Sequence, residues 1–301
     1  MSARIAKIPA NVRRLEPVPP IDVITEDSVA LMFVDRYRGQ LLFDHDLKTW
    51  FVWDGRRWRH DKTTLAFEFA RQLARELTLD QSPKSRMAAN KVSFANGVER
   101  FGRSDRAFAV DSSEWDPNQF LLGTPDGTLS LRDGTLQTAL PEHRITKLTA
   151  TSPADTADCP LWLNFLEEAT GCDRQLIRFL QQLCGYCLTG SVREHAMVFV
   201  YGGGGNGKSV FINTVNSILN EYGTTAAADT FTANRGDKHP TELARLKGAR
   251  LVTASETEKG HAWAEARIKA LTGGDRIAAR FMRQDFFEFA PTFKLIIVGN
   301  H

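Results

Sequence analysis

The sequence has no long hydrophobic run. Nothing in its 301 residues approaches the roughly 18 consecutive apolar residues that a membrane-spanning helix needs. The first residues, Met1 to Lys7, also lack the apolar core of a signal peptide. We therefore expect a protein that works in the cytoplasm and has no membrane partner.

Cysteine is scarce as well. Four cysteines are too few for a disulfide scaffold in a chain of this length, and reduced thiols suit the same compartment. Cys184 and Cys187 have the C-x-x-C spacing of zinc and redox sites, and Cys159 and Cys172 offer further ligands. Both residues of the pair lie in an apolar helical run, so buried core thiols are the favoured interpretation.

An excess of charge of one sign is also missing. The 38 basic and 36 acidic residues leave a net charge of +2, which gives no general attraction for nucleic acid. Any contact with DNA must come from a local patch. With 42% hydrophobic and 25% charged residues, the composition is that of an ordinary globular protein.

The length favours two domains, at about 150 residues per domain. Four prolines between Pro9 and Pro20 indicate an extended leader. Helical spacing of apolar residues predicts helices over Thr25–Arg38 and Leu65–Leu79, with a break at Pro83, and Asp-Gly pairs predict a small β meander over Phe120–Gly134. We expect a leader over 1–24, a mostly helical domain with small β elements over 25–150, a linker and helical pair over 151–190, and a second domain over 191–301.

A tryptophan-rich hairpin is predicted in the first domain. Two β-prone runs between Trp50 and Trp58 flank Asp54-Gly55, a strong turn signal. The rings lie beside Arg56, Arg57 and Arg59, which allows a base-stacking platform for nucleic acid. Aromatic pairs that simply pack on a neighbouring helix are the favoured alternative, because such pairs are common stabilisers of sheets.

The most informative segment follows an apolar strand over 196–201 and precedes an expected helix over 210–219. The eight residues Gly202, Gly203, Gly204, Gly205, Asn206, Gly207, Lys208 and Ser209 fit the pattern G-x-x-x-x-G-K-[ST] at every fixed position. Glycines let backbone N–H groups turn inward around phosphate oxygens, and the helix N-terminus adds positive potential. Lys208 then reaches the β- and γ-phosphates of ATP, and the Ser209 hydroxyl binds Mg²⁺. A glycine-rich turn without ligand is the alternative, but it leaves Lys208 and Ser209 without a role.

Polar residues end two later strands. The run from Arg250 ends in Glu256, which we predict to hold Mg²⁺ or polarise water, with Glu258 in reserve. The run from Phe293 ends in Asn300, which is placed to orient the attacking water or contact the γ-phosphate.

The order of these motifs resembles the superfamily 3 helicases, in particular the C-terminal half of phage and plasmid primase-helicases related to the poxviral primase-helicase. The resemblance rests on Gly202–Ser209, the strand ending at Glu256, Leu271–Asp275 leading into Arg280-Phe281, Phe286–Phe289 and Lys294–His301. It extends upstream to Leu183–Gly190 and the Asp126-Gly127 meander, and so covers most of the chain.

The resemblance implies an α/β fold, with a mostly helical N-terminal domain followed by a P-loop ATPase core of three-layer α/β type. It gives Glu256 the acidic role at the strand end, Asn300 the sensor position, and residues 273–289 a hairpin that contacts DNA. Between residues 276 and 283 there are three arginines and no acid, so Arg280 and Arg283 are the candidate DNA contacts. A solvated strand face is an equally weighted alternative for this strip.

The family carries an arginine finger after the sensor strand, whereas this sequence ends at His301. The resemblance therefore implies a core that is incomplete at its C-terminus, binds Mg-ATP and hydrolyses it feebly. It also implies a hexameric ring of identical subunits if the C-terminus is complete, other replication proteins as partners, and a phage or mobile-element origin in a bacterial host cytoplasm.

The motifs are compatible with three functions. The leading one is an ATP-dependent DNA helicase that acts on single-stranded or forked DNA. The alternative is a truncated, nucleotide-dependent DNA-binding or assembly module with little turnover. A small-molecule kinase is disfavoured, because the thirty residues after the loop offer only Arg235 and Lys238 for a basic lid.

Overall fold

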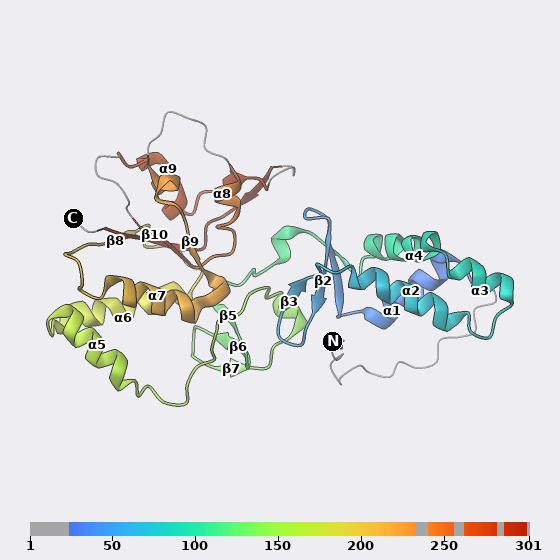
Figure 1. Cartoon of the computed structure of the whole chain (residues 1–301), viewed down its shortest axis with the longest axis horizontal. Coiled ribbons are helices and arrows are strands. Elements are labelled where there is room, and N and C mark those ends of the chain that lie inside the picture. The colour runs from blue at the N-terminus through green and yellow to red at the C-terminus, as the bar shows by residue number, and fades with distance from the viewer. Residues whose placement is uncertain (1–23, 233–239, 256–261, 282–285, 300–301) are drawn as a thin grey trace. The chain divides into compact units, whose positions relative to one another are not determined.

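The computed structural model describes residues 24–232, 240–255, 262–281 and 286–299. The chain divides into two compact units, which we treat separately (Figure 1): unit 1 comprises Met1–Pro117 and Ala139–Thr146, and unit 2 comprises Asn118–Thr138 and Lys147–His301. None of the helices in the described ranges is long and apolar enough to cross a lipid bilayer.

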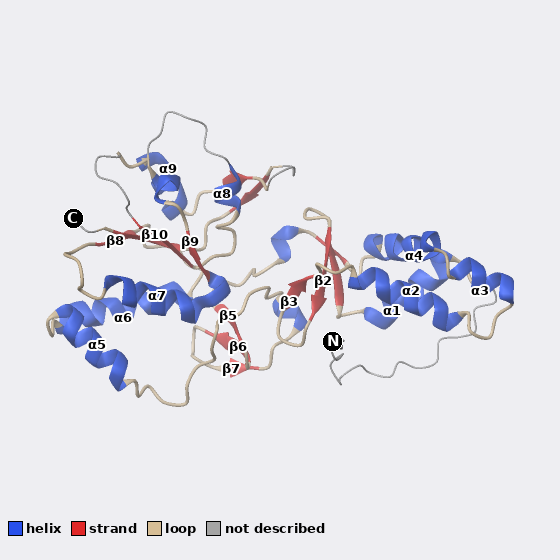
Figure 2. Ribbon diagram, in the orientation of Figure 1, coloured by secondary structure: helices blue, strands red, loops and turns tan. Residues whose placement is uncertain are grey.

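Unit 1 is mostly helical, as expected, with a small sheet (Figure 2). Its elements are α1 (Glu26–Tyr37), β1 (Leu41–Asp44), β2 (Thr49–Trp53), β3 (Trp58–His60), α2 (Leu65–Leu77), α3 (Pro83–Ala89), α4 (Val92–Ser104) and β4 (Ala109–Val110). The sheet order is β3-β2-β1-β4, antiparallel except between β1 and β4.

Two helix starts in unit 1 depend on their first residues. The Thr25 hydroxyl caps α1 by accepting the Ser28 N–H at 3.1 Å. Pro83 does not simply break the chain: α3 begins there, because proline is tolerated at the first helical position. Ser82 caps α3 by accepting the Ser85 N–H at 3.2 Å.

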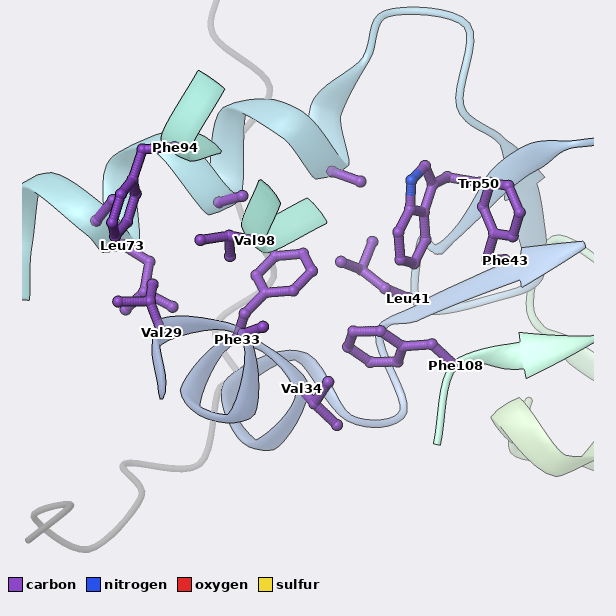
Figure 3. Close-up of a cluster of buried hydrophobic side chains, with 14 of the residues drawn as sticks. Val29, Phe33, Val34, Leu41, Phe43, Trp50, Leu73, Phe94, Val98 and Phe108 are labelled. Atoms are coloured by element: carbon purple, nitrogen blue, oxygen red, sulfur yellow. The ribbon is translucent and has the colours of Figure 1, made fainter. Parts of the chain in front are cut away.

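Trp50, the first aromatic residue of the hairpin, packs in the main core of unit 1 (Figure 3). Trp50, Phe33 and Phe108 pack edge to face with ring centroids 5.6–6.3 Å apart, and the Trp50 Nε1–H donates to the buried Glu99 carboxylate at 2.5 Å. Trp58 is also fully buried. The packing interpretation is therefore confirmed for Trp50 and Trp58, because rings inside a core offer no stacking platform. Trp53 is half-buried.

Unit 2 contains a parallel sheet with helices on both sides (Figure 2). Its elements are β5 (Leu121–Thr124), β6 (Gly127–Ser130), β7 (Leu136–Gln137), α5 (Pro160–Thr170), α6 (Arg174–Leu188), β8 (Met197–Val200), α7 (Lys208–Leu219), β9 (Gly223–Thr225), α8 (Pro240–Ala244), β10 (Leu251–Ser255), α9 (Glu265–Gly273), β11 (Ile277–Ala279), β12 (Phe287–Phe289) and β13 (Lys294–Val298). The parallel sheet has the order β8-β13-β10-β9.

Side chains alternate across this sheet and create two hydrophobic layers. Leu251 and Ile296 face the layer formed with α5, α6 and α7, while Val252 and Leu295 face the layer that includes α8 and α9. This period of two is the normal consequence of strand geometry. Helices on both faces of a parallel sheet give the three-layer α/β fold that the family resemblance implies.

The β5–β7 meander belongs to unit 2, which differs from the predicted ranges 25–150, 151–190 and 191–301. The Gly123 N–H donates to the Tyr222 hydroxyl at 3.0 Å, and the Thr149 N–H donates to the Gly123 carbonyl at 3.0 Å. Turn signals locate the meander along the chain. They carry no information on these contacts with residues up to 99 positions away.

A buried arginine joins the meander to the main sheet. Arg250, directly before β10, is 4% exposed. Its guanidinium donates to the carbonyls of Leu188 and Leu121 and lies over the Tyr222 ring at 4.5 Å. It therefore satisfies a carbonyl at the C-terminus of α6 and one in β5 together.

A buried lysine holds the same end of α6. Lys294, the first residue of β13, is 3% exposed. Its ammonium donates to the carbonyl of Thr189 and, at 3.4 Å, to that of Ser191, and it lies over the Tyr186 ring at 4.7 Å. Burial lowers the pKa of Lys294 to about 7. The negative end of the helix and these carbonyls compensate the charge in part.

Candidate functional site

The glycine-rich segment turns the chain from β8 into α7. Gly207, which caps α7, has a φ of 83°, and a Cβ there would lie 3.0 Å from Phe165 and 3.1 Å from Ala169 of α5. Gly207 is thus required by both its backbone conformation and its packing. Gly203 and Gly204 have open space instead, since a Cβ at either would meet no atom within 4 Å. The loop is anchored at its helix end and open along its middle.

The lysine of the motif points back over this loop. The Lys208 ammonium donates to the carbonyls of Gly202 and Gly203 at 2.7 and 3.0 Å, and to Asn206 Oδ1 at 2.9 Å. Three acceptors match its three N–H donors. The pattern G-x-x-x-x-G-K-[ST] does not predict Asn206 as a hydrogen-bond acceptor for Lys208, because any residue is allowed at its position.

The first turn of α7 adds donors beside the lysine. Gly207 supplies no side chain to cap the helix, so the first N–H groups of α7 have no side-chain acceptor. Ser209 is the second residue of the helix and is exposed on the same turn as Lys208. An ammonium, a hydroxyl and backbone N–H groups at one helix N-terminus form a surface suited to an anion.

The carboxyl ends of three strands lie level beside this loop. In the sheet register Val200 of β8 pairs with Val298 of β13, which pairs with Ser255 of β10. The Gly299 N–H continues the pairing by donating to the Val200 carbonyl at 2.9 Å. In open α/β sheets, ligands bind outside the carboxyl ends of the strands.

Three predicted residues follow these strand ends in sequence. Glu256 comes directly after Ser255, and Asn300 directly after Gly299. Glu256, Glu258 and Asn300 lie outside the described residues, so their roles stay predictions. The structure brings their strands next to the loop; sequence periodicity has no means of placing β13, the last strand in the chain, between β8 and β10.

The hairpin that the resemblance implies over residues 273–289 is present as β11 and β12, which pair antiparallel between residues 277–279 and 287–289. The Arg280 guanidinium lies over the Phe286 ring at 4.8 Å, next to the last pair of this ladder. Arg283 lies outside the described residues. The hairpin is confirmed, and DNA contact by Arg280 and Arg283 stays a prediction.

The C-x-x-C cysteines lie in the core of unit 2. Cys187 is buried, and burial raises its pKa to about 12; Cys184 is half-buried, and burial raises its pKa to about 11. Both pack in the layer around α6 and α7. The interpretation as core thiols is confirmed by this burial. Within the described ranges, no group of three His, Cys, Asp or Glu residues is arranged to hold a metal ion.

The loop, its helix and the parallel sheet define the class of the fold: a three-layer α/β unit with a P-loop motif, preceded by a mainly helical unit. Two family models match separate segments of the chain. Residues 30–171 match the family described as D5 N terminal like, and residues 200–301 match a family of unknown function, DUF5906.

A curated relative is a protein of Acanthamoeba polyphaga mimivirus named "Putative helicase L207/L206". It is 26% identical over 191 residues, which cover 62% of this chain and 20% of that protein. The chain thus spans about a fifth of the length of this relative.

Two solved structures of the NrS-1 C-terminal region share the fold. The apo structure of residues 305–718 aligns with a TM-score of 0.52 and 11% identity, covering 93% of this chain and 58% of that one. The A form aligns with a TM-score of 0.51 and 11% identity, covering 92% and 56%. The chain spans a little over half the length of these structures.

Proposed function

We propose that this chain is the ATP-dependent motor part of a DNA helicase that uses Mg-ATP and acts on single-stranded or forked DNA. The observation that carries the proposal is the position of Lys208 and the first turn of α7, beside the level carboxyl ends of β8, β13 and β10.

The described residues fit a nucleotide triphosphate. A phosphate group offers the Lys208 ammonium charged acceptors in place of the carbonyls of Gly202 and Gly203, and such charge-assisted hydrogen bonds are shorter and stronger. The open space over Gly203 and Gly204 admits phosphate oxygens close to the backbone. The exposed Ser209 hydroxyl lies one residue further along the helix, where it would hold Mg²⁺ together with Glu256.

Chemistry at this site needs little from covalent catalysis. Lys208 would stabilise the charge that develops on the transferred phosphoryl group, and Asn300 would orient the attacking water. Glu256, which follows β10 in sequence, would hold the metal through water or polarise the nucleophile.

The helicase part of the proposal has separate support. The chain is similar to a viral protein whose name describes a helicase, and residues 30–171 match the D5 N terminal like family. The β11–β12 hairpin carries Arg280, and Arg283 follows in sequence, so the hairpin offers cations to DNA phosphates. Unwinding, ring assembly and replication partners are proposals for the whole protein to which the chain corresponds.

The test compares the wild type with Lys208→Ala, using Lys269→Ala as a control. Lys269 is exposed on α9, so this control removes the same charge away from the loop. Calorimetry with Mg-ATP should give a binding heat for wild type and Lys269→Ala, and none for Lys208→Ala. DNA-stimulated hydrolysis then separates two functions: turnover supports the motor, whereas binding without turnover supports a nucleotide-dependent DNA-binding or assembly module. Equal binding heats in all three proteins would overturn the proposal.

A further inference from the structure

A continuous stretch of unit 1 carries positive charge without any acid. Residues 81–98 contain Lys84, Arg86 and Lys91 and no aspartate or glutamate, in a chain with 36 acidic residues. The stretch comprises α3 and the first half of α4, and all three cations are exposed.

Several arginines elsewhere in unit 1 are paired with acids. Ion pairs join Arg36 to Glu76 at 2.6 Å, Arg71 to Glu68 at 2.8 Å and Arg103 to Glu99 at 2.6 Å. Over the described part of the chain, Lys84, Arg86 and Lys91 take part in no ion pair. None of these three charges is therefore neutralised by a direct ion pair.

The nearest acid in the following sequence does not change this. Glu99 is 5% exposed, and its carboxylate already accepts from Trp50 at 2.5 Å and from Arg103. A carboxylate held in this way inside the core is not available to the exposed cations of α3.

The geometry of α3 gathers the cations around an exposed apolar side chain. Ala89 is buried and Ser85 is half-buried, so these two residues mark the inner face of the helix. At about 100° per residue, Met87 lies on the opposite face, with Lys84 and Arg86 on either side of it. Met87 is 72% exposed. Lys91 then caps α4, beside Val92, which is 67% exposed.

We propose that this α3 surface, formed by Lys84, Arg86, Met87, Lys91 and Val92, binds the sugar-phosphate backbone of nucleic acid without sequence preference. The cations fit phosphates, and the apolar side chains fit the sugars and base edges between them. The small polar residues of the same stretch, Ser82, Asn90, Ser93 and Asn96, add hydroxyl and amide donors of the kind that contact phosphate. Figure 1 shows α3 at the end of the helices of unit 1 that is farthest from its strands.

An ordinary solvated face explains these observations less well. Such a face mixes charges of both signs, as α2 does with the Glu68–Arg71 pair and the adjacent Arg75 and Glu76. The α3 surface has one sign only and keeps two large apolar side chains in solvent. The inference goes beyond the proposed motor, because the α3 surface belongs to unit 1, whereas the P-loop and the β11–β12 hairpin belong to unit 2.

The test is a salt titration of the full chain with fluorescent single-stranded and duplex oligonucleotides. The variant Lys84→Gln/Arg86→Gln/Lys91→Gln is compared with a matched control, Arg56→Gln/Arg59→Gln/Lys62→Gln, which removes three exposed cations from the β2–β3 region. Each lost phosphate contact reduces the slope of log affinity against log salt by about 0.9 on duplex and about 0.7 on single strands. We expect the α3 variant to lose roughly two units of slope on the form that binds, and the control to keep the wild-type slope.

Two further measurements decide the outcome. Circular dichroism shows that each variant folds, and calorimetry with Mg-ATP should give equal heats for wild type and both variants, which separates this inference from the proposed motor. Equal slopes of log affinity against log salt for the α3 variant and the control would contradict the inference. Displacement of the oligonucleotide by polyglutamate of equal charge, as effectively as by unlabelled DNA, would overturn the assignment to nucleic acid.

Discussion

Two lysines of unit 2, Lys208 and Lys294, donate hydrogen bonds to backbone carbonyls, yet one lies at a helix N-terminus and the other at a helix C-terminus. Lys208 lies at the N-terminus of α7, beside a loop whose middle is open. Lys294 lies at the C-terminus of α6 and is 3% exposed. Both ammonium groups donate hydrogen bonds to main-chain carbonyl oxygens.

The difference between them lies in the helix end that each one meets. The C-terminus of a helix attracts a cation, so Lys294 has its compensating charge within the fold. The N-terminus of α7 attracts an anion, and Lys208 has only neutral carbonyl and amide oxygens as partners. Lys208 can therefore exchange its acceptors for a phosphate, whereas Lys294 is fixed as part of the core.

The largest expected effect comes from Lys208→Met. Removal of a charge-assisted contact with phosphate should lower nucleotide affinity or turnover by about 10²–10³-fold. The free energy of unfolding should change by less than about 0.5 kcal/mol, as for a substitution outside the core. Calorimetry and urea unfolding measure the two quantities. A large loss of stability with unchanged affinity would reverse the comparison.

Lys294→Met should show the opposite profile. The carbonyls of Thr189 and Ser191 lose a donor in the core, and unsatisfied buried groups cost about 1–3 kcal/mol. Urea unfolding should show this loss, while the folded variant binds Mg-ATP with the wild-type heat. If the variant instead matches wild-type stability, Lys294 does not hold the end of α6.

The same lysine predicts a dependence on pH. Its pKa is lowered by burial from 10.5 to about 7. Between these values the unfolded chain binds one more proton than the folded one, so stability rises with pH. From pH 7 to 9, the free energy of unfolding of the wild type should rise by about 1–2 kcal/mol relative to Lys294→Met. A flat difference across this range would show that Lys294 stays charged in the folded state.

Two glycines of the loop give a smaller, matched contrast. Gly207→Ala places a Cβ at a φ of 83° and 3.0 Å from Phe165, which should cost about 1–2 kcal/mol of stability. Gly203→Ala meets open space and a negative φ, so its stability should stay within about 0.5 kcal/mol of wild type. Thermal unfolding without ligand compares the two, and equal shifts would contradict the anchored loop.

The smallest effect concerns the rates of thiol labelling. Cys159 and Cys172 are exposed, whereas burial raises the pKa of Cys184 to about 11 and that of Cys187 to about 12. Since the thiolate is the reactive form, maleimide at pH 7 should modify the exposed pair first. Mass spectrometry of timed samples gives the order, and early labelling of Cys187 would place it outside the core.

Local signals in the sequence predict much of this structure. The capped start of α1, the tryptophan hairpin, the helical pair around Gly171, and the strand, loop and helix around Lys208 all lie where the sequence places them. In each case the signal is a turn, a cap or a period that adjacent residues determine.

The features that the sequence does not predict depend on long-range contacts. Strand order, the assignment of the meander to unit 2, and the burial of Arg250 and Lys294 depend on residues far apart in the chain. Arg250 and Lys294, for example, donate to carbonyls 62 and 105 positions away. A cation at the start of an apolar strand is the one signal for the two buried residues, and it resembles an ordinary solvated strand end. The roles of Glu256, Asn300 and Arg283 stay predictions.

The two cations that hold α6 also have a mechanical consequence. Arg250 and Lys294 tether the amino ends of β10 and β13, the strands that Glu256 and Asn300 directly follow in sequence. An extended strand barely stretches along its axis, so β10 and β13 connect the C-terminal end of α6 to the sheet edge beside the P-loop at a nearly fixed length. An axial shift of either strand at its carboxyl end would therefore act on the C-terminal end of α6, along the length of the strand.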